Sequence, residues 1–188
     1  MKRIAIFASG SGSNAQRIAE YFSGKPEFSV VRIYCNKPEA YVLDRARRLK
    51  IPSLVFTAND FYRSDKVLQQ LMEDQTNLIV LAGFLWLVPG NILTSFNCRI
   101  INIHPALLPK FGGKGMFGHH VHQAVIASGE TESGITIHYV NEKYDEGDII
   151  FQAKCPVEPD DTPESLAARI HELEHIHFPV IIEQVISK

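Results

Sequence analysis

The chain has 188 residues, of which 45% are hydrophobic, and a formal net charge of −2. This size and apolar content predict a single domain over residues 1–188. The 19 basic residues are scattered, apart from a run at 44–50 that is typical of a solvated helix face, so no nucleic-acid partner is expected. The three cysteines are widely spaced, which suits a reducing compartment. The sequence shows no signal-peptide pattern and no apolar stretch of about 20 residues, so we expect a cytoplasmic protein without a membrane segment. A monomer and a homodimer are both compatible with the sequence.

Segments with strand-like and helix-like patterns alternate along the chain. Strands are expected near residues 2–8, 29–35, 53–56, 78–83, 99–104, 134–140 and 148–155. Helices are expected near 14–23, 38–49, 60–74, 89–96 and 119–128, with Pro38 and Pro89 in first turns. A final helix is expected from Thr162 as its cap, with a kink or a split at Pro179, near Phe178.

This order predicts an α/β fold with a Rossmann-like sheet. The sheet should be twisted and mostly parallel, with about seven strands and with helices on both faces. The loop between the last two strands is too short for a helical crossover, so these strands should pair antiparallel.

The first strand leads into a glycine-rich turn, GSGSN at residues 10–14, and then into a helix. Glycines let the backbone approach a ligand closely, and the free N–H groups at a helix start favour a phosphate. The spacing of Gly10, Gly12 and Ala15 only approximates the dinucleotide fingerprint, and the second strand ends in YCN at 34–36, where that fingerprint needs an acid. We therefore expect a phosphate rather than NAD, with a tight turn that binds no ligand as the alternative.

The segment INIHPALLPKF, residues 101–111, places Asn102 and His104 two positions apart at the end of an apolar run. Residues i and i+2 of a strand point to the same face, so both side chains should converge on one spot. The prolines from Pro105 onward end the strand, which puts the pair at the carboxyl edge where open α/β sheets bind ligands. An amide can donate to a developing oxyanion while an imidazole moves a proton, which suits acyl transfer. The alternative is a strand-end asparagine and a partly buried histidine, each bonded to backbone groups.

The loop between the last two strands carries Asp145, followed by Glu146 and Gly147. A carboxylate at this place would pair with His104, favour the imidazolium and raise its pKa toward the operating pH. Asp and Gly are also ordinary turn residues, so Asp145 alone has a plainer explanation. We expect Asn102, His104 and Asp145 to form one catalytic set.

NIHPALLP, from Asn102 to Pro109, and DEG, from Asp145 to Gly147, resemble the hallmark segments of the folate-dependent formyltransferases. The resemblance runs from the first strand to the last helix. It implies one formyltransferase domain, with a phosphate-binding amino-terminal half and a folate-binding carboxyl-terminal half. The implied reaction transfers the formyl group of 10-formyltetrahydrofolate to the amine of glycinamide ribonucleotide in purine biosynthesis. No metal and no NAD are expected, because an acyl shift to an amine needs neither a Lewis acid nor redox chemistry.

The resemblance also implies which residues bind the two substrates. Those implied for the ribonucleotide are Gly12, Ser13, Asn14, Pro105, His120, His122 and Glu174. Those implied for the folate are Phe84, Leu85, Trp86, Leu87, Val88, Asn141, Glu142, Lys143 and Tyr144. Many relatives carry an arginine where this chain has Trp86, so an aromatic ring is expected to stack on the folate tail in place of polar contacts. The loop at 110–118 is longer than in many relatives, which leaves the register of the two histidines open.

HELEH, residues 171–175, spells the H-E-x-x-H pattern of zinc proteases. A catalytic zinc needs a third protein ligand, and only His177 follows, without the glycine spacing of that pattern, so no zinc is expected. The plain alternative is a polar helix face. The resemblance instead gives Glu174 to the ribose hydroxyls of the substrate.

Two other kinds of function remain open from the sequence. A formyltransferase for initiator aminoacyl-tRNA or a formyl-folate hydrolase would use the same domain, but these enzymes generally carry a second domain. A noncatalytic nucleotide-binding module would use only the GSGSN turn, and it would leave Asn102, His104 and Asp145 unexplained.

Overall fold

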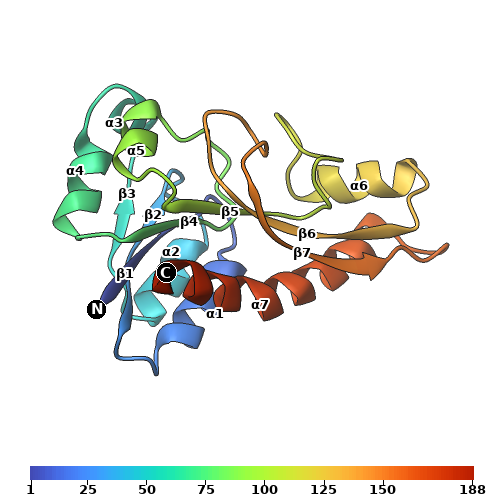
Figure 1. Cartoon of the computed structure of the whole chain (residues 1–188), viewed down its shortest axis with the longest axis horizontal. Coiled ribbons are helices and arrows are strands. Elements are labelled where there is room, and N and C mark those ends of the chain that lie inside the picture. The colour runs from blue at the N-terminus through green and yellow to red at the C-terminus, as the bar shows by residue number, and fades with distance from the viewer.

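The computed structural model describes residues 1–188 as seven strands and seven helices, which alternate along the chain except at α3–α4 and β6–β7 (Figure 1). The strands are β1 (Lys2–Phe7), β2 (Phe28–Cys35), β3 (Ser53–Val55), β4 (Leu78–Leu81), β5 (Ile100–His104), β6 (Glu132–Tyr139) and β7 (Ile149–Pro156). The helices are α1 (Ser13–Phe22), α2 (Val42–Arg48), α3 (Ala58–Tyr62), α4 (Lys66–Glu73), α5 (Gly90–Ser95), α6 (His119–Ala127) and α7 (Pro163–Ser187). All the predicted strands are present.

The strands form one sheet in the order β3-β2-β1-β4-β5-β6-β7. β1 to β5 pair parallel, and β6 and β7 add an antiparallel end. The predicted α/β fold with two antiparallel last strands is confirmed. The chain order reverses at β1, which lies between β2 and β4, and such a switch point opens a crevice at the carboxyl ends of the strands.

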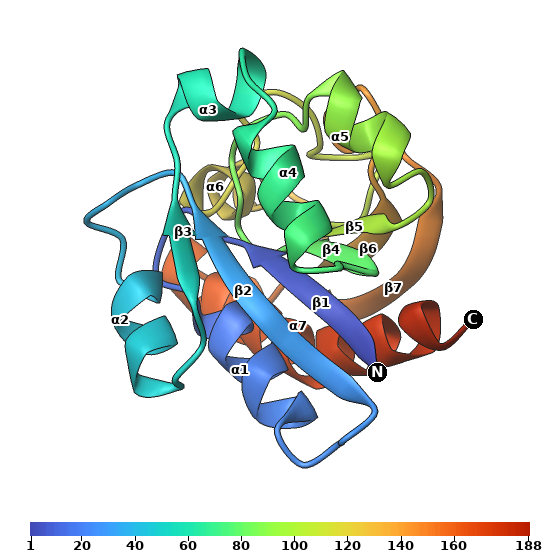
Figure 2. The same cartoon turned by 90° about the vertical axis from the view of Figure 1, so that its left-hand side faces the viewer.

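Alternate residues of the central strands face two separate apolar layers. Ile4 and Ile6 of β1 belong to the layer with α1, α2 and α7, whereas Ala5 and Phe7 belong to the layer with α3, α4 and α5. Figure 2 shows these helices on opposite sides of the sheet. Both faces of β1 are covered, which explains why its sequence is a continuous apolar run. None of the helices combines the length and apolar composition needed to cross a membrane.

Helix α2 is shorter than predicted. It begins only at Val42, and Pro38 lies in a turn that precedes it rather than in a first helical turn. Pro89 comes directly before α5, as its N-cap residue in an extended conformation. Proline fits both places because its fixed φ also suits turns and extended backbone.

The segment predicted as one helix at 60–74 is two helices, α3 and α4. A capping box between Thr57 and Asp60 starts α3 earlier than predicted. The Ser64 hydroxyl then donates to the Asp60 carbonyl and accepts from the N–H of Lys66, at 3.1 and 3.4 Å. These local side-chain bonds take up backbone groups that a continuous helix would pair, so the helix is interrupted.

Helix α7 begins as predicted, with a capping box between Thr162 and Ser165, but it is not split at Pro179. Proline has no N–H, so the carbonyl of His175 loses its helical partner. The Nε of Arg17 on α1 lies 3.3 Å from that carbonyl oxygen and donates to it. A neighbouring helix therefore satisfies the freed acceptor, and α7 continues to Ser187.

Gly134 of β6 provides a test of the pairing between β6 and β7. A Cβ atom at this position would lie 2.0 Å from the carbonyl oxygen of Ala153 on β7. We expect Gly134→Ala to lower the free energy of unfolding by about 2–3 kcal/mol in urea denaturation, because the neighbouring backbone has to shift. Gly24→Ala is the matched control, since nothing lies within 4 Å of the added carbon. Equal free energies of unfolding for the two variants would contradict this packing.

Candidate active site

A cavity of about 930 Å³ lies at the carboxyl ends of β1, β4 and β5. Its walls come from segments 9–14, 81–88, 102–105, 113–119 and 143–145, and from α7. Loops that follow strands at a switch point line the ligand crevice of open α/β sheets, so this position agrees with the topology. Most of the residues predicted to bind or react share this one cavity.

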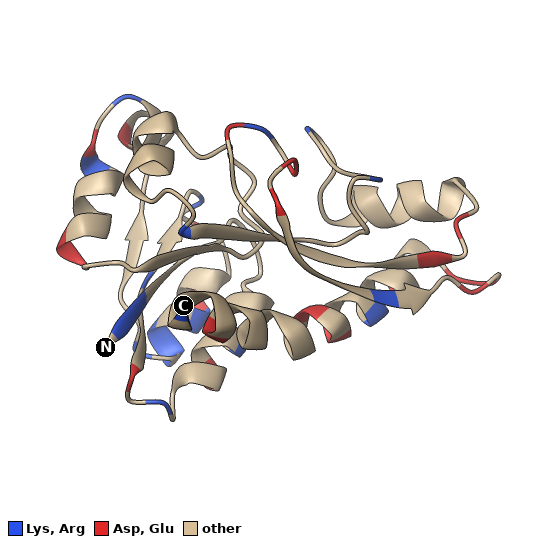
Figure 3. Ribbon diagram, in the orientation of Figure 1, with Lys and Arg blue, Asp and Glu red and all other residues tan.

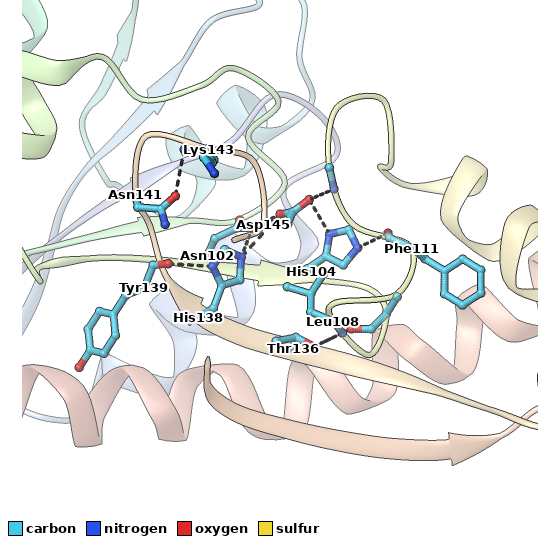
Figure 4. A network of polar contacts seen from close by, with 12 residues as sticks. Asn102, His104, Leu108, Phe111, Thr136, His138, Tyr139, Asn141, Lys143 and Asp145 are labelled. Carbon is cyan, nitrogen blue, oxygen red and sulfur yellow. Dashed lines mark hydrogen bonds and ion pairs between the residues drawn. The ribbon is translucent and has the colours of Figure 1, made fainter. Parts of the chain in front are cut away.

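Asn102, His104 and Asp145 converge in the cavity wall, although they come from β5 and from the distant loop between β6 and β7 (Figure 4). The Nδ1 of His104 lies 3.4 Å from Oδ2 of Asp145, and the Nδ2 of Asn102 lies 3.4 Å from Oδ1 of the same carboxylate. An amide, an imidazole and a carboxylate are therefore within reach of one small group. This arrangement can stabilise an oxyanion and move a proton at the same place.

The antiparallel pairing of β5 with β6 adds a second imidazole that sequence reasoning missed. Asn102 stands directly opposite His138, and His104 stands opposite Thr136. The Nε2 of His138 lies 3.1 Å from the Nδ2 of Asn102. In the sequence, Thr136 and His138 have the same i, i+2 spacing as Asn102 and His104. This spacing points to the active site only once the register between β5 and β6 is known.

The ring of His104 has a fixed proton on one nitrogen. Its Nε2 lies 2.7 Å from the carbonyl oxygen of Phe111, and because a carbonyl can only accept, Nε2 is the donor. Burial lowers the pKa of His104, and the opposing effects of the Asp145 carboxylate and the Phe111 carbonyl do not overcome it. The prediction that Asp145 raises the pKa of His104 toward the operating pH is wrong for the net shift, which is downward. In the free protein the ring is therefore neutral, with Nδ1 as its basic atom. The Asp145 carboxylate, 3.4 Å from Nδ1, can stabilise the imidazolium once Nδ1 takes up a proton.

Asp145 is held as an anion although it is largely buried. Its Oδ2 accepts the backbone N–H of Gly113 at 3.0 Å. Burial alone would raise the pKa of Asp145, but the contacts with His138, His104 and that N–H bring it below the ordinary value. The carboxylate is therefore charged near neutral pH and ties the loop 110–118 to the loop between β6 and β7, called the hairpin loop below.

One buried hydroxyl organises the segment after His104. The Oγ1 of Thr136 donates to the carbonyl of Ala106 at 2.7 Å and accepts the N–H of Leu108 at 3.0 Å and the Nε2 of Gln152 at 2.9 Å. These bonds fix the backbone of residues 105–109 against β6. The segment that follows His104 is consequently held in place.

At the opposite end of the cavity lies the GSGSN turn. Gly12 has a φ of 75°, and a Cβ atom there would lie 2.4 Å from the Val42 side chain, so only glycine fits. Glu174 is 4% exposed, and its Oε2 accepts from Asn14 Nδ2 and His171 Nδ1, each at 2.8 Å. The hydrogen bond with Glu174 raises the pKa of His171. The HELEH pattern thus places a buried carboxylate and an imidazole whose charged form it favours beside the turn.

The cavity wall also contains basic residues and a histidine for which no role was predicted from the sequence. Lys37 and Lys114 lie in its wall, and so does His119, whereas the predicted His120 is exposed and outside it. His122 does line the cavity, and its Nδ1 has no partner in the protein. Burial lowers the pKa of His122 to about 4, so this imidazole is neutral. The pair from α6 that faces the cavity is therefore His119 with His122.

The wall predicted for the folate is mostly in place. Residues 84–88, Lys143 and Tyr144 line the cavity, but Asn141 and Glu142 do not. The ring of Trp86 packs on four aromatic rings with centroids 5.8 to 6.3 Å away, from Phe56, Phe61, Tyr62 and Phe84. These contacts fix Trp86 as an apolar part of the cavity wall.

No group of three or more His, Cys, Asp or Glu side chains is arranged to hold a metal ion. Of the two histidines of HELEH, His171 bonds to Glu174 through Nδ1, whereas the buried Nε2 of His175 has no hydrogen-bond partner in the protein. Within this pattern the internal polar contact is therefore the one between His171 and Glu174.

Thr136 offers a test of the segment that follows His104. We expect Thr136→Val, which keeps the shape but leaves the Ala106 carbonyl and Leu108 N–H unpaired, to lower the free energy of unfolding by about 2–4 kcal/mol. Thr136→Ser retains the hydroxyl and is the control in the same chemical denaturation experiment. A valine variant as stable as the serine variant would show that these bonds do not hold the segment.

Comparison with known proteins agrees with this geometry. Residues 2–182 match the model of the family described as "Formyl transferase". A phosphoribosylglycinamide formyltransferase of Bacillus subtilis is 36% identical over 192 residues, which cover 100% of this chain and 96% of the relative. The chloroplastic phosphoribosylglycinamide formyltransferase of Arabidopsis thaliana is 43% identical over 180 residues, which cover 93% of this chain but only 62% of that relative.

Solved structures show the same similarity. The crystal structure of phosphoribosylglycinamide formyltransferase from Bacillus halodurans has a TM-score of 0.88 at 37% identity, covering 100% of this chain and 96% of that one. The enzyme from Anaplasma phagocytophilum has a TM-score of 0.91 at 33% identity, covering 100% of this chain and 87% of that one. With a family model that spans nearly the whole sequence, this chain belongs to the formyl transferase family.

Proposed function

We propose that the protein transfers the formyl group of 10-formyltetrahydrofolate to the amine of glycinamide ribonucleotide. The products are formylglycinamide ribonucleotide and tetrahydrofolate, a step of purine biosynthesis. The observation that carries the proposal is the convergence of Asn102, His104 and Asp145 in a cavity that also contains the GSGSN turn. The names of the full-length bacterial relatives support the same substrates.

The ribonucleotide would lie along the amino-terminal side of the cavity. The backbone of Gly12, Ser13 and Asn14 at the start of α1 suits a phosphate. Lys37 adds positive charge there, and the hydrogen bond with Glu174 raises the pKa of His171, which favours its charged form. Glu174, held by Asn14 and His171, is an acceptor for ribose hydroxyls. Pro105 and His122 would border the glycinamide part.

The folate would lie between residues 84–88 and the hairpin loop with Lys143 and Tyr144. Backbone groups and apolar side chains of the first segment suit a flat heteroaromatic ring. Trp86 supplies a stacking surface for the aminobenzoyl group, and Lys114 and Lys143 supply charge for the acidic tail. Figure 3 shows basic residues in the loop 110–118 and in the loop between β6 and β7.

The chemistry proceeds through a tetrahedral intermediate. The amine of the ribonucleotide attacks the formyl carbon, and the resulting oxyanion accepts a hydrogen bond from Nδ2 of Asn102. The neutral Nδ1 of His104 takes a proton from the ammonium that forms, and Asp145 stabilises the imidazolium. The same proton passes, directly or through water, to the leaving folate nitrogen, and the bond from that nitrogen to the formyl carbon breaks. The reaction needs neither a metal nor NAD.

We also propose that residues 1–188 act as one catalytic domain and that the protein works in the cytoplasm. The phosphate turn and the catalytic residues border one cavity on one continuous sheet, which supports the first point. Cys35, Cys98 and Cys155 are all unpaired, which suits a reducing compartment and supports the second.

Formyl transfer to glycinamide ribonucleotide, charged initiator tRNA and water should be assayed in parallel, with the ribonucleotide as the only efficient acceptor. We expect Asn102→Ala to lower kcat by about 10²–10³ through loss of an oxyanion donor. His104→Ala and Asp145→Ala should lower it by about 10²–10⁴ through loss of proton transfer. All three variants should retain their circular dichroism spectra. Wild-type turnover in the three variants would refute these roles.

The pH profile tests the state of His104. Because the base must be neutral, kcat/KM should fall as the pH drops through the pKa of His104, which burial places below the ordinary value of 6.5. Asp145 raises that pKa, so Asp145→Asn should move the acid limb to lower pH as well as reduce the rate. A limb that moves to higher pH, or that stays in place, would contradict the assignment of Nδ1 as the base.

A further inference from the structure

His138 lies in the wall of the active site but has no part in the proposed proton transfer. It is 2% exposed, and it borders the cavity on β6 directly opposite Asn102. The register between β6 and β7 shifts between Ile137 and His138. Irregularities of this kind occur beside active sites, where they re-aim a side chain.

The tautomer of His138 is set by its own backbone. Nδ1 lies 2.8 Å from the carbonyl oxygen of Tyr139, which can only accept, so Nδ1 carries the hydrogen. That carbonyl is packed against Gly147, where a Cβ atom would lie 1.7 Å from the oxygen. In the neutral ring Nε2 is therefore a lone pair, and it faces the Nδ2 of Asn102 at 3.1 Å.

This lone pair decides which end of the Asn102 amide points at the reacting group. The Nδ2 of Asn102 has two hydrogens, and its two neighbours, Nε2 of His138 and Oδ1 of Asp145, are both acceptors. The contact with His138 is 3.1 Å and that with Asp145 is 3.4 Å, so the second hydrogen is held more loosely. A rotated amide would bring its oxygen close to the carboxylate, where two acceptors repel each other.

We infer, on the basis of the proposed function, that His138 is a positioning residue that anchors one amide hydrogen of Asn102, so that the other, which Asp145 holds more loosely, can bind the oxyanion. The two cross-strand residues act as a unit in which only Asn102 touches the reacting atoms. His138 and Asp145 are themselves 3.6 Å apart, which is too long for a strong hydrogen bond, so the contact between His138 and Asn102 is the decisive one.

A double-mutant cycle in the formyl transfer assay tests this inference. His138→Leu removes the acceptor, and we expect kcat to fall by about tenfold to a hundredfold, part of the loss typical of a deleted oxyanion donor, while KM for both substrates changes less than about twofold. In the Asn102→Ala background the same substitution should lower kcat less than about twofold, because the side chain that it positions is absent. His138→Gln, whose amide oxygen can accept, should recover part of the loss. His138→Phe is a second acceptor-free variant with a similar ring shape, to be used where leucine prevents folding.

His177→Leu is the control for a general effect of removing a histidine. His177 of α7 packs against Phe151 of β7, outside the cavity. Its loss should therefore leave kcat within about twofold of wild type. An independent readout is the NMR signal of the Asn102 side-chain amide, identified by its absence in Asn102→Ala. One of its two hydrogens should lose its downfield shift in His138→Leu and keep it in His177→Leu.

The outcomes separate the inference from the function on which it rests. Additive losses in the cycle, a loss carried by KM alone, or wild-type kcat in His138→Leu would overturn the role of His138 and leave the proposed function standing. Absence of formyl transfer by the wild-type chain would overturn both.

Discussion

The antiparallel pairing of β5 with β6 is the constraint on which the rest of the active site depends. It sets Asn102 opposite His138 and His104 opposite Thr136, so four polar side chains share one face at the carboxyl edge of the sheet. The other face of the same strands carries Ile101, Ile103 and Ile137 into the core. A slip of one residue would exchange the two faces, so the burial of these isoleucines also holds the catalytic register.

Burial then decides the chemistry of the groups that the pairing brings together. In water, the carboxylate of Asp145 would raise the pKa of His104, but the low-dielectric wall disfavours the charged ring more strongly. The same wall strengthens the attraction once a proton arrives, because Coulomb interactions are less screened there. A neutral base beside a permanent anion can therefore gain and lose a proton during one catalytic cycle, whereas a preformed ion pair would resist both steps.

Much of this could be predicted from local sequence. Periodicity located all seven strands, and the spacing of Asn102 and His104 at the end of an apolar run placed them on one face. What failed depends on contacts between distant segments. Pro179 does not split α7, because Arg17 of α1 donates a hydrogen bond to the carbonyl of His175 that the proline leaves unpaired. The role of His138 becomes visible only when β6 is aligned with β5. The lowered pKa of His104 comes from burial, which no spacing of residues reveals.

Asp145 links the reacting centre to the loops that enclose it. Its two oxygens face Asn102 and His104 on the sheet and the N–H of Gly113 on the loop 110–118. Phe111 in the same loop accepts from His104, so the loop is bonded to the base and to the carboxylate. A group that displaced these residues would disturb the loop as well as the chemistry. The same hydrogen bonds therefore fix both the cavity wall and the positions of the catalytic groups. They lie where the hairpin loop, the loop 110–118 and β5 meet.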